Sequence, residues 1–122
     1  MDIVEVLKAL AHENRIRILN ILAENELCVC ELENILQINQ SNASRHLSKL
    51  KHANLIKGRK KAQWIYYSLN QDLLTEHQFI KLLLADELDD FANAQADLKR
   101  LEKYKNSSLS CETLSDSNIF SD

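Results

Sequence analysis

Three cysteines are the residues in this chain whose type and spacing are most suited to chemistry. Cys28 and Cys30 are separated by a single residue, and Cys111 lies far along the chain. Thiolates are soft ligands that select thiophilic ions over Mg²⁺ or Ca²⁺. A position at a helix N-terminus lowers the pKa of a thiol and favours ligation at neutral pH. Cys28 and Cys30 are therefore candidate ligands, and the alternative is two buried small hydrophobic residues.

The spacing of the two neighbouring cysteines sets a geometric condition. Leu32, Ile35 and Leu36 repeat at helical spacing after the pair, so both cysteines are predicted at the start of a short helix. Residues i and i+2 of a regular helix point about 200° apart. One ion can hold both sulfurs only if the first turn unwinds, and such a distortion would make a switch.

A second group of residues suggests contact with a polyanion. Between Asn34 and Gln71 there are seven of the 15 Lys and Arg residues and no acid, whereas the rest of the chain carries all 18 acids. Such segregation creates a steering field even though the net charge is −3, and the alternative is a solvated basic face. Short amides, hydroxyls and an Arg can read base edges, and Lys can bind phosphates. The candidate DNA-binding residues are Gln40, Ser41, Asn42, Ser44, Arg45, His46, Lys49, Lys57, Arg59, Lys60 and Lys61.

The predicted elements place these residues on a winged helix-turn-helix, a mainly α fold with a small β-hairpin. Asn39 is a candidate N-cap for a second short helix, on which Ala43, Leu47 and Leu50 share one face. Two short helices joined by a few residues form a helix-turn-helix. The β-rich stretches 55–57 and 64–69 flank a polar tip and predict a two-stranded hairpin, in which Trp64 and Tyr66 are packing residues.

The C-terminal third is predicted to dimerise. Apolar residues form a stripe over some six helical turns from Ile80 to Leu101, and a break near Asp89-Asp90 is left open. A stripe this long exceeds what one small core absorbs, so we expect it to pair with a second copy. The alternative is a helix that folds back on its own core. Residues 1–106 are predicted to form the domain, and the serine-rich, acidic residues 107–122 a flexible tail.

Composition excludes several classes of protein. A chain of 122 residues with 45% hydrophobic residues, one Gly and no Pro is neither disordered nor a turn-rich β-sandwich. It contains no apolar run long enough for a membrane span and no export signal, which predicts a cytoplasmic protein without a membrane partner. It also contains no Gly-rich phosphate loop, paired carboxylates or nucleophile–base motif. We therefore predict that it is not an enzyme, although a thiol–disulfide enzyme is a remote alternative.

Four motifs together resemble the ArsR/SmtB family of metal-sensing repressors. The resemblance covers about residues 3–70 and implies a dimeric winged helix that binds operator DNA when metal-free and releases it when metal binds. The cysteine motif is similar to that of the family's arsenic/antimony and cadmium/lead sensors. The motifs are Ala9-Leu10-Ala11-His12-Glu13-Asn14-Arg15-Ile16-Arg17-Ile18-Leu19, Glu26-Leu27-Cys28-Val29-Cys30-Glu31-Leu32, Ser44-Arg45-His46-Leu47 and Trp64-Ile65-Tyr66-Tyr67-Ser68-Leu69.

Departures from the family pattern bear on the choice of ion. Enterobacterial arsenic sensors have a third cysteine where this chain has Glu33, and As(III) prefers three sulfurs. Cys111 could complete the site from either chain of a dimer, and a small cellular thiol or water could do the same. The alternative for Cys111 is a stray tail thiol. The cadmium/lead sensors add N-terminal cysteines, which residues 1–27 lack, and the zinc and cobalt site needs more than His77. Family wings usually carry a Gly where this chain has Ala62.

The sequence thus predicts a homodimeric repressor of double-stranded operator DNA, whose operator is an imperfect inverted repeat. Its inducer is predicted to be As(III) or Sb(III), bound by Cys28, Cys30 and Cys111, with no permanently bound cofactor. Two alternatives with the same fold remain open. One senses a soft divalent ion such as Cd(II) or Pb(II), and the other senses oxidation of the thiols.

Overall fold

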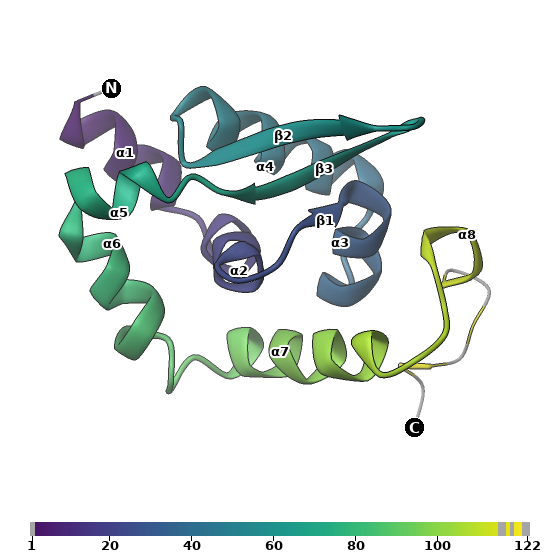
Figure 1. Cartoon of the computed structure of the whole chain (residues 1–122). Helices are drawn as coiled ribbons and strands as arrows, with labels where there is room; N and C mark the ends of the chain where they lie inside the picture. Colours follow the sequence, from purple (N-terminus) through teal and green to yellow (C-terminus); the bar gives the residue numbers. More distant parts are fainter. Residues whose placement is uncertain (1, 115–116, 118, 121–122) are drawn as a thin grey trace.

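The computed structural model describes residues 2–114, 117 and 119–120. Helices predominate, and one small sheet lies across them (Figure 1). In chain order the elements are α1 (Ile3–Leu10), α2 (Glu13–Leu22), β1 (Leu27–Cys28), α3 (Val29–Leu36), α4 (Gln40–His52), β2 (Ile56–Lys61), β3 (Trp64–Leu69), α5 (Asp72–Glu76), α6 (Gln78–Leu82), a π-helical turn η1 (Leu83–Glu87), α7 (Ala92–Lys105) and α8 (Cys111–Leu114).

Helices α3 and α4 form the predicted helix-turn-helix. Gln37 ends α3 in the left-handed conformation, with φ 59°, and so turns the chain sharply toward α4. Asn39 caps α4 as predicted, because its side chain accepts a hydrogen bond of 2.8 Å from the backbone N–H of Asn42. Ala43, Leu47 and Leu50 are buried on the inner face of α4, which leaves its polar face outside.

The predicted hairpin is present, but it belongs to a sheet of three strands in the order β1-β3-β2. Strands β2 and β3 pair antiparallel from Ile56↔Leu69 to Lys61↔Trp64. The two-stranded prediction was incomplete because Leu27 and Cys28 pair with Tyr67 and Tyr66 of β3. A two-residue strand carries no readable alternation, so its pairing is set by the hairpin beside it.

The C-terminal stripe does not form one continuous helix. Helix α6 and turn η1 end at Glu87, residues 88–91 turn the chain, and α7 then runs across beneath α2 and α3 (Figure 1). Leu101 and Tyr104 are buried there against the chain's own core. Folding back, the alternative considered above, is therefore correct for residues 92–105. The stripe is therefore not free to pair with a second copy over all six turns, because Leu101 is buried in the core of its own chain, and pairing through the rest of the C-terminal third stays a prediction.

The segment predicted to be a tail contains α8, which packs against α3. Its Leu114 is only 2% exposed and belongs to the core cluster. Residues 115–116, 118 and 121–122 of that prediction lie outside the described residues. The division at residue 106 and the flexibility of the tail stay predictions. No helix in the described ranges combines the length and hydrophobicity that a membrane span requires.

Candidate functional site

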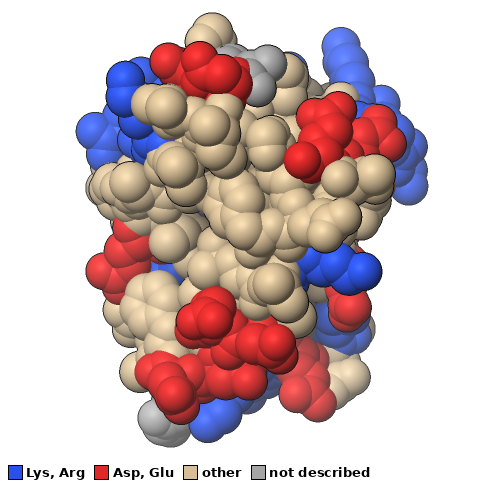
Figure 2. Space-filling model, turned by 90° about the vertical axis from the view of Figure 1, so that its left-hand side faces the viewer, with Lys and Arg blue, Asp and Glu red and all other residues tan. Residues whose placement is uncertain are grey.

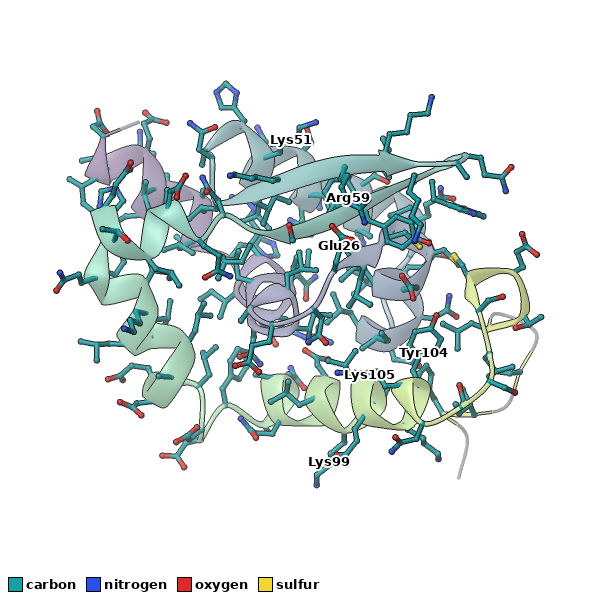
Figure 3. All side chains as sticks on the ribbon, viewed as in Figure 1. Glu26, Lys51, Arg59, Lys99, Tyr104 and Lys105 are labelled. Carbon is teal, nitrogen blue, oxygen red and sulfur yellow. A yellow bond between two sulfur atoms is a disulfide. The ribbon has the colours of Figure 1, made fainter. Side chains whose placement is uncertain are left out.

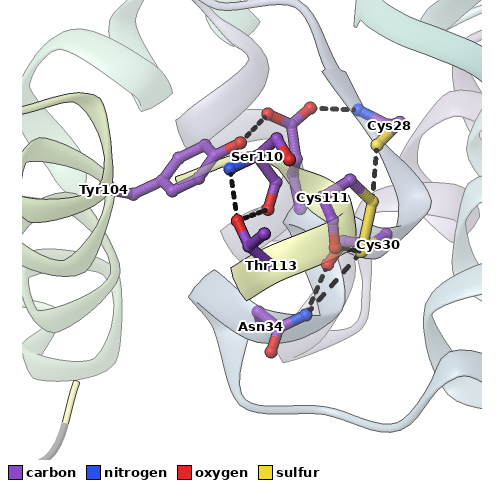
Figure 4. The surroundings of a disulfide bond; sticks show 8 residues. Cys28, Cys30, Asn34, Tyr104, Ser110, Cys111 and Thr113 are labelled. Carbon is purple, nitrogen blue, oxygen red and sulfur yellow. Dashed lines mark hydrogen bonds between the residues drawn. A yellow bond between two sulfur atoms is a disulfide. The ribbon is translucent and has the colours of Figure 1, made fainter. Parts of the chain in front are cut away.

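The three cysteines meet at one end of α3, although they are far apart in the sequence (Figure 4). Cys28 ends β1, Cys30 lies in the first turn of α3, and Cys111 begins α8. Cys30 and Cys111 are joined by a disulfide, with their Cα atoms 5.7 Å apart. The Cys28 Sγ lies 3.4 Å from the Cys111 Sγ. The fold therefore gathers three sulfur atoms from two segments into one cluster.

Cys28 lies outside the regular part of α3, so the condition stated above for two cysteines within one helical turn does not apply to it. The residue has extended backbone, with φ −90° and ψ 170°, and lies just before the helix rather than within it. Its sulfur is therefore not bound by the 3.6-residue period, and it approaches Cys111 without any unwinding of α3. The premise that both cysteines lie within the first turn was therefore wrong, so the condition of about 200° does not apply to this pair.

Glu31 connects the cysteine cluster to α7. One carboxylate oxygen of Glu31 accepts a hydrogen bond of 2.9 Å from the backbone N–H of Cys28. The other accepts a hydrogen bond of 2.5 Å from the hydroxyl of Tyr104. Burial raises the pKa of the Cys28 thiol, and the Glu31 carboxylate adds to the increase. The expected lowering of this pKa by the helix N-terminus is outweighed, so Cys28 is held as a thiol near neutral pH.

The donor set of the cluster suits a thiophilic ion only when all three sulfurs are free. Within the described residues, no group of three or more His, Cys, Asp or Glu side chains is arranged to hold a metal ion. Two of the three sulfurs are already bonded to each other. Reduction of this bond by two electrons and two protons would leave three thiols on adjacent segments.

A buried ion-pair network holds the opposite end of α3. Asp97 of α7 is fully buried, and its two oxygens accept hydrogen bonds of 2.8 Å from Nε and Nη2 of Arg17. Arg100 donates to the same carboxylate at 2.7 Å. Arg17 also donates to the carbonyl of Leu36 at 2.7 Å, and Arg100 donates to that of Ile35. These carbonyls end α3, so α7 fastens both ends of this helix.

Most of the predicted DNA-reading residues lie on the exposed face of α4. Asn42 is half-buried and its side-chain oxygen accepts a hydrogen bond of 3.2 Å from Arg45. His46 differs, because it is only 1% exposed and cannot reach a base edge from this position. The exposed members of the set on this helix are Gln40, Ser41, Ser44, Arg45 and Lys49.

His46 instead supports the helices behind α4. Its Nδ1 accepts a hydrogen bond of 3.3 Å from Nε of Arg15, and its ring lies 4.3 Å from that of His12. Burial lowers the pKa of His46 to about 4, and the positive charges of neighbouring residues, Arg15 among them, lower it further. The ring is therefore neutral at physiological pH and available as an acceptor.

The wing carries its four basic residues on β2, and all four are exposed. Arg59 pairs with Glu26 at 2.6 Å, and Figure 3 shows these two residues next to each other at the hairpin. Lys57 lies 3.9 Å from Asp72. Lys60 and Lys61 make no ion pair within the described part of the chain. Trp64 and Tyr66 are half-buried, which agrees with the packing role expected of them.

An apolar surface lies at the opposite side of the molecule, on α1 and α6. Leu7 is 49% exposed and Leu82 is 61% exposed. These residues line a cleft of about 530 Å³ together with Leu10, Phe79 and Leu83. In Figure 2, which shows this side, uncharged residues cover the middle of the face and acidic side chains gather below them.

Sequence comparison finds several regulators among the relatives. Residues 12–57 match the model of the family described as bacterial regulatory protein, arsR family. The arsenic resistance transcriptional regulator ArsR2 of Pseudomonas putida is 34% identical over 100 residues, which cover 80% of this chain and 87% of that protein. The ArsR1 protein of the same organism is 44% identical over 69 residues, 56% of this chain and 54% of its own length. A cadmium resistance regulator, the CadC homolog of Staphylococcus aureus, is 41% identical over 59% of this chain and 60% of its own. The matched region thus spans little more than half of these last two relatives.

Solved structures agree with this fold. Reduced HlyU from Vibrio cholerae has a TM-score of 0.59 and 41% identity over 66% of this chain and 82% of its own. A homodimeric winged helix-turn-helix domain from Mycobacterium bovis has a TM-score of 0.61 and 27% identity, over 71% of this chain and 82% of its own.

Fold and relatives together define a winged helix-turn-helix transcriptional regulator, which confirms the predicted fold class and the prediction that the chain is not an enzyme. The chain belongs to the ArsR family of bacterial regulatory proteins.

Proposed function

We propose that this protein is a homodimeric transcriptional repressor that releases operator DNA when As(III) or Sb(III) binds Cys28, Cys30 and Cys111. The observation that carries the proposal is the meeting of the three sulfurs, since Cys111 joins Cys28 and Cys30 from 81 or more residues away. Two relatives are named as arsenic resistance regulators, which supports the choice of ion. The ion is an inducer rather than a resident cofactor.

Binding would replace oxygen ligands with sulfur. Three thiols each lose a proton to one hydroxyl of As(OH)₃, three As–S bonds form, and three waters leave. Three sulfurs satisfy the pyramidal preference of the ion, and a soft ion prefers them to carboxylate oxygen. The reaction requires the reduced protein, because the Cys30–Cys111 bond occupies two of the donors.

The same geometry supplies a route from the ion to the DNA-binding elements. Cys28 lies in β1, whose partner β3 is one strand of the wing. Cys30 lies in α3, the first helix of the helix-turn-helix. Ion binding needs to shift the DNA-bound state by only a few kcal/mol to release the operator.

DNA binding is assigned to the exposed face of α4 and to the wing. The first turns of α4 would enter the major groove, and Lys60 and Lys61 would contact phosphates. The apolar surface on α1 and α6, defined by Leu7 and Leu82, would face the same surface of a second copy. Two recognition helices would then bind successive major grooves, so the operator is expected to be an imperfect inverted repeat.

A redox-sensing repressor is the second candidate function. The observation that favours it is the Cys30–Cys111 disulfide, with the Cys28 thiol beside it. In this case a peroxide would take two electrons from two thiols, and the bond would hold α8 against α3.

A Cd(II)- or Pb(II)-sensing repressor is a further alternative, since a relative is named as a cadmium resistance regulator. The predicted cytoplasmic location stays a prediction.

The deciding experiment measures release of DNA. A labelled duplex, enriched from a random library by binding to the reduced protein, is followed by fluorescence anisotropy during titration with arsenite, Sb(III) or Cd(II). The variants are Cys28→Ser, Cys30→Ser and Cys111→Ser, with Ser110→Ala as the matched control beside the cluster. Release by arsenite that is lost in all three cysteine variants and kept in the control supports the proposal.

Other outcomes favour the alternatives. Release by peroxide without an ion, reversed by a thiol reductant, supports redox sensing. Release by Cd(II) alone supports the divalent sensor. Tight DNA binding that no ion and no oxidant changes contradicts the sensing function in every form.

A further inference from the structure

A cleft of about 360 Å³ lies between α1, the start of α2 and the C-terminal half of α4. Its lining is rich in groups that bind anions. Lys8 comes from the last turn of α1, Arg15 from α2, and Lys49 and His52 from the last turn of α4. Glu5 is the one acidic residue of the lining. Three cationic side chains from three elements therefore converge on one hollow.

Arg15 is held in place before any ligand arrives. Its Nη1 donates to the carbonyls of Lys8 and Ala9, at 3.4 and 3.3 Å, and its Nε donates to His46. The second terminal nitrogen, Nη2, makes no hydrogen bond with any described residue. A planar guanidinium that is fixed in this way has lost most of its freedom already, so a bound anion would not have to order it.

The lysines of the cleft carry uncompensated charge. The ammonium groups of Lys8 and Lys49 form no ion pair with a residue that the structure describes. On the wing, by contrast, Arg59 is paired with Glu26 and Lys57 approaches Asp72. Among the described residues of the lining, Glu5 is the one acid that reduces the positive charge of the cleft.

The cleft lies beside the helix that is assigned to the major groove. Helix α4 has 13 residues and is therefore about 20 Å long at 1.5 Å per residue. The major groove is only about 12 Å wide. If α4 enters the groove at an angle, with its first turns against the bases, its last turn lies over the sugar–phosphate backbone at the groove edge. Lys49 and His52 lie on that last turn.

We propose that the cleft formed by Lys8, Arg15, Lys49 and His52 binds a phosphate group of the DNA backbone beside the major groove. This inference rests on the proposed DNA-binding function and adds Lys8, Arg15 and His52 to its contact surface. The site carries no base specificity. It would fix the depth and angle of α4, as contacts to phosphates generally do.

The test is the salt dependence of DNA binding. Binding of a labelled random-sequence duplex is measured by anisotropy over a series of NaCl concentrations for the wild type, Lys8→Ala, Glu5→Gln and Lys60→Ala/Lys61→Ala. Lys99→Ala is the matched control, because Lys99 lies on α7, away from the hairpin and Lys51 in Figure 3. Each lost phosphate contact lowers the slope of log K against log [NaCl] by about 0.9 per protomer.

We expect Lys8→Ala to lower this slope and Glu5→Gln to raise the affinity for the duplex. Lys99→Ala is expected to change neither the slope nor the affinity. An unchanged slope in Lys8→Ala, with a reduced slope in Lys60→Ala/Lys61→Ala, overturns this inference and leaves the proposed function intact. A wild type that binds no duplex overturns both.

A second arm distinguishes DNA phosphate from a free ion. The protein without DNA is titrated with inorganic phosphate at constant ionic strength, and the imidazole resonances of His52 are followed by NMR. Saturable binding of free phosphate, together with an unchanged salt slope in Lys8→Ala, assigns the cleft to a free anion and overturns the DNA contact.

Discussion

The buried carboxylate of Asp97 offers the sharpest test of what holds α7 to the helix-turn-helix. We consider Asp97→Asn, which keeps the size of the side chain and removes its charge. Arg17, only 8% exposed, would then be left as a buried cation without its counter-ion. Breaking a buried ion pair by changing one partner costs about 3–5 kcal/mol. Because Arg17 keeps its hydrogen bonds to Leu36 and Asn14, we expect the free energy of unfolding to fall by about 3 kcal/mol.

The assay is urea denaturation followed by far-UV circular dichroism, at one protein concentration and with reductant present. The double variant Arg17→Gln/Asp97→Asn replaces the ion pair with two amides that can bond to each other. Its loss of stability should be smaller than the sum of the two single losses, since the buried charge of Arg17 is removed together with that of Asp97 and only the partly exposed Arg100 loses a charged partner. Glu26→Gln is the control, because its ion pair with Arg59 is exposed, and its midpoint should hardly change.

A loss of less than about 0.5 kcal/mol in the free energy of unfolding of Asp97→Asn, a size typical of surface substitutions, would contradict a buried ion pair at this position. Exact additivity in the double variant would also refute it, because partners at 2.8 Å must be coupled if the pair is formed.

Three further predictions concern other parts of the molecule. His46 is neutral in the fold down to a pH of about 4, against a pKa of 6.5 when it is free, so lowering the pH from 6.5 to 4 should reduce stability by up to about 3 kcal/mol. Urea midpoints across this range should fall more steeply for the wild type than for His46→Asn, and parallel curves would exclude His46 as the cause. Leu82→Lys places a charge in the apolar surface and should convert a dimer to a monomer in sedimentation velocity, whereas an unchanged mass would place the interface elsewhere. Tyr104→Phe removes the hydrogen bond to Glu31, so DNA affinity should be kept while the arsenite concentration for half-release falls by up to about tenfold. An identical arsenite curve would show that this contact does not restrain the cluster.

The helix-turn-helix and the hairpin could be predicted because their signals are local. Asn39 caps α4 through its own side chain, and the apolar residues of α4 repeat at the helical period. The pairing of β1 could not be predicted, since Leu27 and Cys28 form too short a stretch to show a period. The sequence indicated a possible break in the helix at Asp89-Asp90, but not the direction that the chain takes after residues 88–91.

The residues of the candidate site likewise separate into those with a local sequence signal and those whose role depends on distant contacts. Cys28 and Cys30 stood out by spacing, whereas Cys111 was a candidate only because As(III) prefers three sulfurs. Its contact with the other two cysteines depends on the path of α7, which no local pattern encodes. His46 was assigned to DNA from its place among polar neighbours. Its burial depends on Arg15 and His12, more than 30 residues earlier in the chain. The sequence did not single out Asp97, because an ion pair across 80 residues leaves no trace in periodicity.

The pairing of Cys28 with Tyr66 makes Cys28 a direct connection between α3 and the wing. On one side its peptide N–H is tied to Glu31 and so to the axis of α3, and on the other it is in register with the strand that returns from the wing. A displacement of Cys28 is therefore shared at once by both elements, with no chain of intermediate side chains to absorb it. Base contacts and backbone contacts would be lost together, in a single step rather than in sequence.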